Sequence, residues 1–281
     1  VLHGLGGALV MDWTHASRAG AFDLLSRRWD AASIEAAGLG IAFPRLEPSG
    51  TRIGMMEKAL AGRLGLAADV ALVTGGHDHL CAAFGSGLRN DTDLFLSAGT
   101  SEAHLALLEA PLEVPLTKDR AEGIDQGCYV DAERYYAHVN IHSGHFYRQW
   151  RHLLYDGVGD EEMYTEIDQA AATDILFQPL PDQRTSRFDR LPYDADRAVV
   201  MRAVMAGLAE RSADIVADLE VVTGSRFERL LVAGKPTRAS SWKRLRSASY
   251  RWPMAVVDEP EPAAFGAASL AARALDSAPA R

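Results

Sequence analysis

The sequence predicts an α/β fold in which a mixed β-sheet is flanked by helices, and three observations point to it. Residues 229–275 alternate strand and helix patterns, which is typical of parallel strands covered by helices. Residues 93–141 contain apolar strand patterns joined by short turns, including a hairpin around residues 131–134, which indicates antiparallel neighbours. Residues 194–224 carry apolar side chains at helical spacing, which predicts a long helix with one core-facing side.

The first third of the chain alternates short helical patterns with turn signals. Residues 21–40 and about 53–64 predict helices. An apolar strand is expected at 69–76, followed by a short helix at 79–88 that glycines stop. The chain opens on Val1 without an initiator methionine or a polar lead-in, so we expect it to be the later part of a longer polypeptide.

The other elements follow from the same patterns. Strands are expected at 93–101, 102–109, on both sides of the hairpin turn within 127–141, and at 174–180, 229–234 and 253–258. Helices are expected at 144–156, 160–172, 194–224, 240–249 and 261–275, and a polar loop at 181–193. One face of the long helix forms a core stripe with no cofactor implied: Val200, Val204, Leu208, Ile215 and Leu219.

Length and composition exclude several classes of protein. With 281 residues, 48% of them hydrophobic and 24% charged, the chain can form one large domain or two lobes with cores of their own. Its formal net charge of -9 argues against a nucleic-acid or anionic-membrane partner and favours a small-molecule ligand. No run is long enough to span a membrane and no signal peptide is evident, which predicts a cytoplasmic protein. Cys81 and Cys128 are expected to be buried thiols, because two cysteines this far apart form neither a disulfide framework nor a zinc motif.

Three predicted strands end in small or polar residues, where a ligand site is expected. The endings are LVTGGHDH at 72–79, FLSAGTS at 95–101 and LLVAGKPTR at 230–238. Ligands of open α/β sheets bind beyond the carboxyl ends of the strands. We therefore expect these three endings to converge on one site.

Asp78 is the candidate for proton transfer. Gly75 and Gly76 allow a sharp turn and a close approach by a ligand, and the N-terminus of the following helix favours an ionised carboxylate. Such a carboxylate can accept a proton from a hydroxyl, although an N-cap is an alternative interpretation. His77 and His79 suit polar contacts with a substrate, because a single H-D-H without further ligand spacing is a weak metal signal.

Two turns are candidates for binding phosphate. Gly99, Thr100 and Ser101 can offer backbone N–H groups and hydroxyls to phosphate oxygens. Gly234 and Thr237 precede a helix, which fits a phosphate or nucleotide position, and a basic solvated loop is the alternative. A further histidine group follows a strand and gives only a weak metal signal: His138, His142 and His145.

Taken together, these segments resemble the FGGY family of carbohydrate kinases. The matching segments follow one another in the family's order: DWTHASRAGAFDLLSRRWD, PSGTRIG, GGHDHLCAAFGSG, LFLSAGTS, LFQPLPDQRTS, LLVAGKPTRASSW and EPAAFGAASLAA. The collinear match spans nearly the whole chain and is far more specific than any single motif. The GHDHLCAAFGSG segment alone leans slightly towards that of fuculose-type kinases.

The resemblance implies an actin-like, ribonuclease H-like ATPase fold with two lobes and ATP in the cleft. Residues 1–88 would be the end of the N-terminal lobe, and residues 89–281 the C-terminal lobe on the nucleotide-binding side. Asp78 would be the general base and would lie near the metal of Mg-ATP, with His77 and His79 beside the substrate. The nucleotide would lie along six residues: Gly99, Thr100, Ser101, Gly144, Gly234 and Thr237.

The activity that the resemblance implies is ATP-dependent phosphorylation of a sugar or polyol hydroxyl with Mg²⁺, in a protein that forms a homodimer as members of the family often do. The family's first phosphate loop, Asp-Gly-Thr, does not occur in these residues, so we expect the isolated fragment to be inactive. Lys235 and Pro236 stand where the family has glycines, which leaves a non-catalytic relative that binds a nucleotide or sugar as the alternative. A metal hydrolase built on the H-D-H group is a third interpretation.

Overall fold

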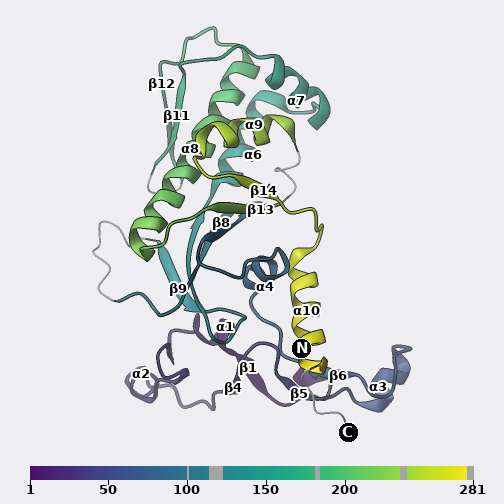
Figure 1. The fold of residues 1–281 in the computed structure, drawn as a ribbon. Helices are drawn as coiled ribbons and strands as arrows, with labels where there is room; N and C mark the ends of the chain where they lie inside the picture. The colour runs from purple at the N-terminus through teal and green to yellow at the C-terminus, as the bar shows by residue number, and fades with distance from the viewer. Residues whose placement is uncertain (100, 114–122, 181–183, 235–238, 277–281) are drawn as a thin grey trace.

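The centre of the fold is a six-stranded mixed sheet (Figure 1). The computed structural model describes residues 1–99, 101–113, 123–180, 184–234 and 239–276. Its central strands are β7 (Asp93–Ala98), β8 (Glu102–Leu108), β9 (Ile124–Cys128), β10 (Tyr135–Ile141), β13 (Arg229–Ala233) and β14 (Met254–Val256). They lie in the order β14-β13-β7-β8-β10-β9. Because β13 is parallel to both of its neighbours while β7, β8, β10 and β9 are antiparallel, the predicted mixed sheet is confirmed.

Helices cover both faces of this sheet (Figure 1). On one face α8 (Arg197–Thr223) packs Ile215 and Leu219 against Leu94 and Leu96 of β7. On the other face, α4 (Asp78–Gly85) and α10 (Pro262–Asp276) pack against the side chains that point the opposite way, such as Phe95. Successive residues of a strand point to opposite faces, so strands covered on both sides are apolar almost throughout.

The long helix confirms the stripe expected from its sequence. Asp196 caps its start by accepting a hydrogen bond from the backbone N–H of Ala198 at 2.7 Å, and Gly224 ends it with a φ of 72°. The five stripe residues are all buried: Val200, Val204, Leu208, Ile215 and Leu219. The first half of α8 packs in a separate core formed with α6 (Ser143–Tyr155), α7 (Asp160–Gln169), α9 (Ser240–Ser249), β11 (Leu176–Pro179) and β12 (Ser186–Asp189).

The N-terminal part consists of short elements below the sheet in the view of Figure 1. Its elements are η1 (His3–Leu5), β1 (Val10–Asp12), α1 (Trp13–Ala16), β2 (Phe22–Asp23), β3 (Arg28–Trp29), α2 (Ala31–Ala36), β4 (Arg45–Glu47), β5 (Arg52–Met55), α3 (Lys58–Arg63) and β6 (Ala71–Val73). β1 pairs with β4 in parallel, while β2–β3 and β5–β6 are antiparallel pairs. A small core of four buried residues holds β5, β6 and α3 together: Ile53, Met56, Ala61 and Leu72.

Two helix predictions were wrong in part, and the strands β1, β4 and β12 were missed. Residues 52–55 form a strand because they pair with β6, so the helix expected from 53 is only α3. Residues 22–29 form the β2–β3 pair, and only α2 is helical within 21–40. β12 lies in the stretch expected to be a loop and pairs with β11. In each case pairing with a neighbour outweighed local propensity.

Two further expectations concern the chain as a whole. Cys81 and Cys128 are buried free thiols, as predicted. No helix within the described parts of the chain is both long and apolar enough to cross a membrane.

α4 and α10 cross so closely that glycines meet the backbone of the opposite helix. A Cβ added to Gly266 would lie 1.9 Å from the carbonyl oxygen of Cys81, and one added to Gly85 would lie 2.2 Å from that of Pro262. Both contacts are far too short for any side chain. This contact lets α10 support α4, the helix that begins at Asp78.

The crossing predicts a stability effect confined to the contact. Gly266→Ala should lower the free energy of unfolding by about 1–3 kcal/mol, because the methyl group overpacks the interface. Gly62→Ala is the matched control, since Gly62 is also helical but has no atom within 4 Å of the added Cβ. It should gain about 0.5–1 kcal/mol from helix propensity. Urea unfolding measures both, and equal effects would contradict the contact.

Candidate active site

Asp78 is the first residue of α4 and projects from its N-terminus. The N-cap position belongs to His77, whose side chain makes no capping bond, so the N-cap interpretation of Asp78 was wrong. The Asp78 carboxylate is 73% exposed, and its Oδ1 accepts a hydrogen bond from the backbone N–H of His79 at 2.8 Å. His77 Nδ1 lies 3.1 Å from the same oxygen. An exposed carboxylate between two histidines at a helix N-terminus is available to a ligand.

The turn before Asp78 needs glycine for packing. A Cβ at Gly76 would lie 2.8 Å from Val130 Cγ1 and 3.2 Å from both Ser49 Oγ and Thr14 Oγ1. At Gly75 nothing lies within 4 Å, and neither glycine has a positive φ. The sequence therefore identified the right turn, but its cause is the close approach of three segments rather than an unusual backbone conformation.

Asp12 and Thr14, which the sequence analysis missed, hold this turn in place. Thr14 is fully buried, and its Oγ1 accepts a hydrogen bond from the backbone N–H of His77 at 2.7 Å. The same hydroxyl donates to the carboxylate of Asp12, which caps α1 by accepting from the backbone N–H groups of Thr14 and His15. The D-x-T spacing at the start of a helix was the signal that could have identified this pair.

The Asp12 carboxylate is also paired with His15, whose ring is half-exposed. Asp12 Oδ2 lies 2.6 Å from His15 Nδ1. Burial raises the pKa of Asp12, but the hydrogen bonds from His15 and Thr14 outweigh it and lower the pKa overall. The hydrogen bond to Asp12 raises the pKa of His15. The pair therefore favours a charged imidazole close to Asp78.

Four histidines form a row beside Asp78. The ring centroids are 5.7 Å apart between His15 and His77, 5.6 Å between His77 and His79, and 6.0 Å between His79 and His138. His138 lies on β10 with its side chain 7% exposed. Burial lowers its pKa to about 4, so its ring is neutral at neutral pH. The sequence analysis had considered His138 only as a metal ligand.

Arg18 and Asp125 complete the polar surroundings of the row. Arg18 Nη2 lies 3.8 Å from Asp125 Oδ2, and Arg18 Nη1 donates a hydrogen bond to the Tyr136 hydroxyl at 3.4 Å. His138 Nδ1 lies 3.9 Å from Asp125 Oδ2. Imidazoles, a guanidinium and carboxylates in one region can bind the hydroxyl groups of a polar ligand. Within the residues described, no group of three or more His, Cys, Asp and Glu side chains could hold a metal ion.

The two predicted phosphate-binding endings come together at one edge of the central sheet. β7 and β13 are adjacent and parallel, so their carboxyl ends meet. Gly234 has a φ of 120°, and a Cβ there would lie 1.9 Å from the carbonyl oxygen of Ala98. Between β7 and β8 the backbone N–H of Gly99 donates to the carbonyl of Ser101 at 3.1 Å. Thr100, Thr237, Lys235 and Pro236 lie outside the described residues.

The third strand ending, LVTGGHDH at 72–79, does not belong to the central sheet, contrary to expectation. β6 pairs with β5 in a separate two-stranded sheet, so the three endings do not share one sheet edge. β10 links the two groups instead. Within β10, His138 lies beside His79. Three residues later, Ile141 pairs with Glu102, which directly follows Ser101. Gly144 follows β10 as the second residue of α6.

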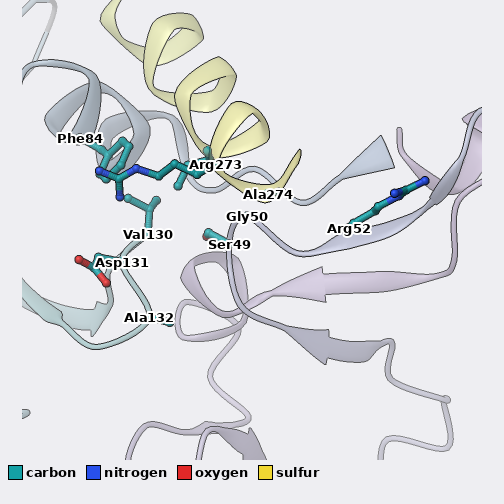
Figure 2. A pocket seen from close by; sticks show the side chains of 10 residues that line it. Ser49, Gly50, Arg52, Phe84, Val130, Asp131, Ala132, Arg273 and Ala274 are labelled. Atoms are coloured by element: carbon teal, nitrogen blue, oxygen red, sulfur yellow. The ribbon is translucent and has the colours of Figure 1, made fainter. Parts of the chain in front are cut away.

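A separate hollow of about 390 Å³ lies between the N-terminal part and the ends of α4 and α10 (Figure 2). Its lining includes Ser49, Phe84, Asp131 and Arg273. The guanidinium of Arg273 lies 4.8 Å from the centre of the Phe84 ring. None of the predicted site residues lines this hollow, so the candidate active site is the region around Asp78 and the edge of the central sheet.

Burial of His138 predicts a pH-dependent stability. Its folded pKa of about 4 lies below the ordinary 6.5, so the unfolded chain binds more protons between these values. The contribution of His138 to stability is therefore fully present above pH 6.5 and is lost as the pH falls toward 4. His138→Gln should flatten this fall by up to about 3 kcal/mol. His152→Gln, at a 73% exposed position, should leave it unchanged. Urea unfolding across this pH range measures it, and parallel curves for all three proteins would contradict it.

Comparison with known proteins gives matches along the whole chain. Residues 1–85 match the family model described as the N-terminal domain of the FGGY family of carbohydrate kinases. The chain is 25% identical over 275 residues to an L-fuculokinase of Escherichia coli O157:H7, covering 95% of this chain and 57% of that protein. The chain thus spans little more than half the length of this curated relative.

Solved structures confirm the fold. A ligand-bound xylulose kinase from Lactobacillus acidophilus superposes with a TM-score of 0.84 at 19% identity, covering 97% of this chain and 57% of that one. Plasmodium falciparum glycerol kinase with ADP gives a TM-score of 0.82 at 17% identity, covering 98% and 56%. The expected actin-like, ribonuclease H-like fold is therefore correct.

Proposed function

The chain belongs to the FGGY family of carbohydrate kinases, and from this premise we propose that it serves ATP-dependent phosphorylation of a sugar or polyol hydroxyl with Asp78 as the general base. The observation that carries the proposal is the exposed Asp78 carboxylate at the N-terminus of α4, with His77 and His79 on either side. A base must be reachable by the hydroxyl that it deprotonates, and this carboxylate is.

The proposed reaction needs one proton acceptor and precise positioning. The substrate hydroxyl gives its proton to Asp78 while its oxygen forms a bond to the γ-phosphorus of ATP, and the bond from that phosphorus to the bridging oxygen breaks to release ADP. Mg²⁺, when bound with ATP, would neutralise phosphate charge, and Asp78 is proposed to lie near it. Phosphoryl transfer otherwise depends mainly on alignment of the two substrates.

The nucleotide is proposed to lie at the edge where β7 and β13 end. Gly99 and Gly234 are exposed at these two endings, and neither carries a side chain that would keep a phosphate group away. Gly144 is the second residue of the adjoining helix α6. Thr100 and Thr237 are proposed as further contacts on the resemblance alone. A similar fold with ADP in the glycerol kinase structure supports this assignment.

The sugar is proposed to bind on the Asp78 side of the site, beside His77 and His79. Imidazole nitrogens can form hydrogen bonds with hydroxyls, which suits a polyhydroxylated ligand. The names of relatives suggest L-fuculose and D-xylulose as the first sugars to test. The match of residues 1–85 to an N-terminal domain supports the proposed division between residues 1–88 and 89–281.

A non-catalytic relative that binds a nucleotide or a sugar is the second candidate. It is favoured by Lys235 and Pro236, which stand where the family has glycines. The two candidates differ in one observable, which is phosphate transfer. The kinase binds ATP and a sugar and transfers phosphate, whereas the non-catalytic relative binds a nucleotide or sugar without transferring phosphate.

The test of the base compares two aspartates in matching positions. In the protein expressed from its complete reading frame, Asp78→Asn should lower kcat by about 10²–10⁴-fold, because an amide cannot accept the hydroxyl proton. Asp160→Asn is the control: Asp160 also begins a helix, and its side chain is 72% exposed against 73% for Asp78. ADP release is measured with L-fuculose, D-xylulose, gluconate and glycerol.

Each outcome of this assay tests one of the hypotheses. Equal turnover by the two variants would show that Asp78 is not the base. Binding of MgATP without turnover of any sugar by the unmodified protein would favour the non-catalytic candidate. Residues 1–281 alone are expected to give no turnover, and ADP release that depends on a sugar would contradict that expectation.

A further inference from the structure

A buried ion pair lies directly behind the proposed phosphate turn. Glu102 is the first residue of β8, immediately after Ser101, and is 3% exposed. Its carboxylate accepts a hydrogen bond from the guanidinium of Arg246, which is 1% exposed and lies on α9. The pair thus joins the strand that leaves the phosphate turn to the helix that follows the β13 ending.

The pair belongs to a closed chain of hydrogen bonds that returns to β8. Arg246 Nη1 donates to the Tyr250 hydroxyl at 2.7 Å, and Tyr250 donates to Ser212 Oγ at 2.6 Å. Because Ser212 accepts from Tyr250, its own proton can be given to His104 Nε2, 2.6 Å away. Burial lowers the pKa of His104 to about 3, so the ring is neutral, and Nε2 accepts this bond in the tautomer whose proton is on Nδ1. The chain connects β8, α9 and α8.

Stability alone is a poor reason for such an arrangement. Burying two charges costs desolvation that their attraction rarely exceeds, and apolar residues of similar size often serve a core as well or better. What a hydrogen-bonded buried pair does supply is a fixed geometry between the elements it joins. Here those elements flank the edge of the sheet assigned to the nucleotide.

We propose that Glu102 and Arg246 are positioning residues for the nucleotide. On the strand side, the contact of Gly234 with Ala98 fixes how closely β13 approaches β7 at this edge. On the helix side, the ion pair fixes α9 against the start of β8. Together they set the spacing between the two endings that receive the polyphosphate and nucleoside. The inference rests on the proposed function only in assigning the nucleotide to this edge.

A matched ion pair at the opposite end of the same sheet provides the control. Asp93 begins β7 and is 3% exposed, as Glu102 is. It accepts two hydrogen bonds from Arg229, at 3.1 and 2.5 Å, at the start of β13. This pair joins β7 to β13 at the end remote from Ala98 and Gly234. Removing Arg229, whose side chain is 49% exposed, leaves the buried Asp93 carboxylate unpaired without touching the proposed nucleotide edge.

The experiment measures MgADP and sugar binding by calorimetry, with urea unfolding in parallel, for the protein expressed from its complete reading frame. Glu102→Gln should weaken MgADP binding by at least about tenfold, because a displaced phosphate turn loses alignment, and should leave sugar binding unchanged. Arg229→Met, which unpairs the buried Asp93, should lower stability comparably and leave MgADP binding within about twofold. Arg246→Lys, which keeps the charge, should lie between Glu102→Gln and the unmodified protein.

A double variant separates positioning from stability. Glu102→Gln with Arg246→Met removes both charges, so it should fold with stability close to the unmodified protein and still bind MgADP weakly. It also provides the measurement if Glu102→Gln alone does not fold. Restored MgADP affinity in the double variant, or equal weakening by Arg229→Met, would overturn the inference. Failure of the unmodified protein to bind MgADP would overturn both proposals, whereas MgADP binding without sugar turnover would overturn only the proposed function.

Discussion

Burial of β8 on both faces is the constraint from which the arrangement of the site follows. All seven residues from Glu102 to Leu108 are buried, so the strand needs a covering helix on each side. α8 supplies one cover, and α4 with α10 supplies the other. The helix that carries Asp78 at its N-terminus is therefore part of the core packing. Its position relative to the proposed phosphate turn is fixed by the same apolar contacts that stabilise the sheet.

Burial also explains the polar chain behind the turn. Glu102 and His104 are neighbours on the α8 face of β8, and neither can reach water. Unpaired polar groups in such a place are costly, so each requires a partner from a covering helix. Arg246 and Ser212 are those partners, and Tyr250 joins them to each other. Two buried polar residues of β8 thus require polar partners on α8 and α9, more than a hundred positions away in the sequence.

Local patterns predicted the central sheet well and the N-terminal part poorly. β8, β13 and α8 were predictable because long apolar runs or a strong helical stripe mark them. β5 was not, because only its pairing with β6 makes residues 52–55 a strand. At the site, glycine turns identified Asp78, Gly99 and Gly234. The contacts of Thr14 with His77 and of Glu102 with Arg246 join residues far apart in sequence, which no local pattern can indicate. The roles of the site residues and the division at residue 88 stay predictions.

Asp78 depends on both ends of the chain. Thr14, near the beginning, accepts the hydrogen bond of the His77 N–H just before it, and Gly266, near the end, lets α10 press against Cys81 within its helix. α4 is thereby packed on the sheet while its first residue is tied to the N-terminal part. His15 and Arg18 approach Asp78 from the N-terminal side, and His138 approaches from the sheet. Any movement of one part against the other would therefore move this carboxylate, and the proposed reaction depends on its alignment with a hydroxyl and a phosphate.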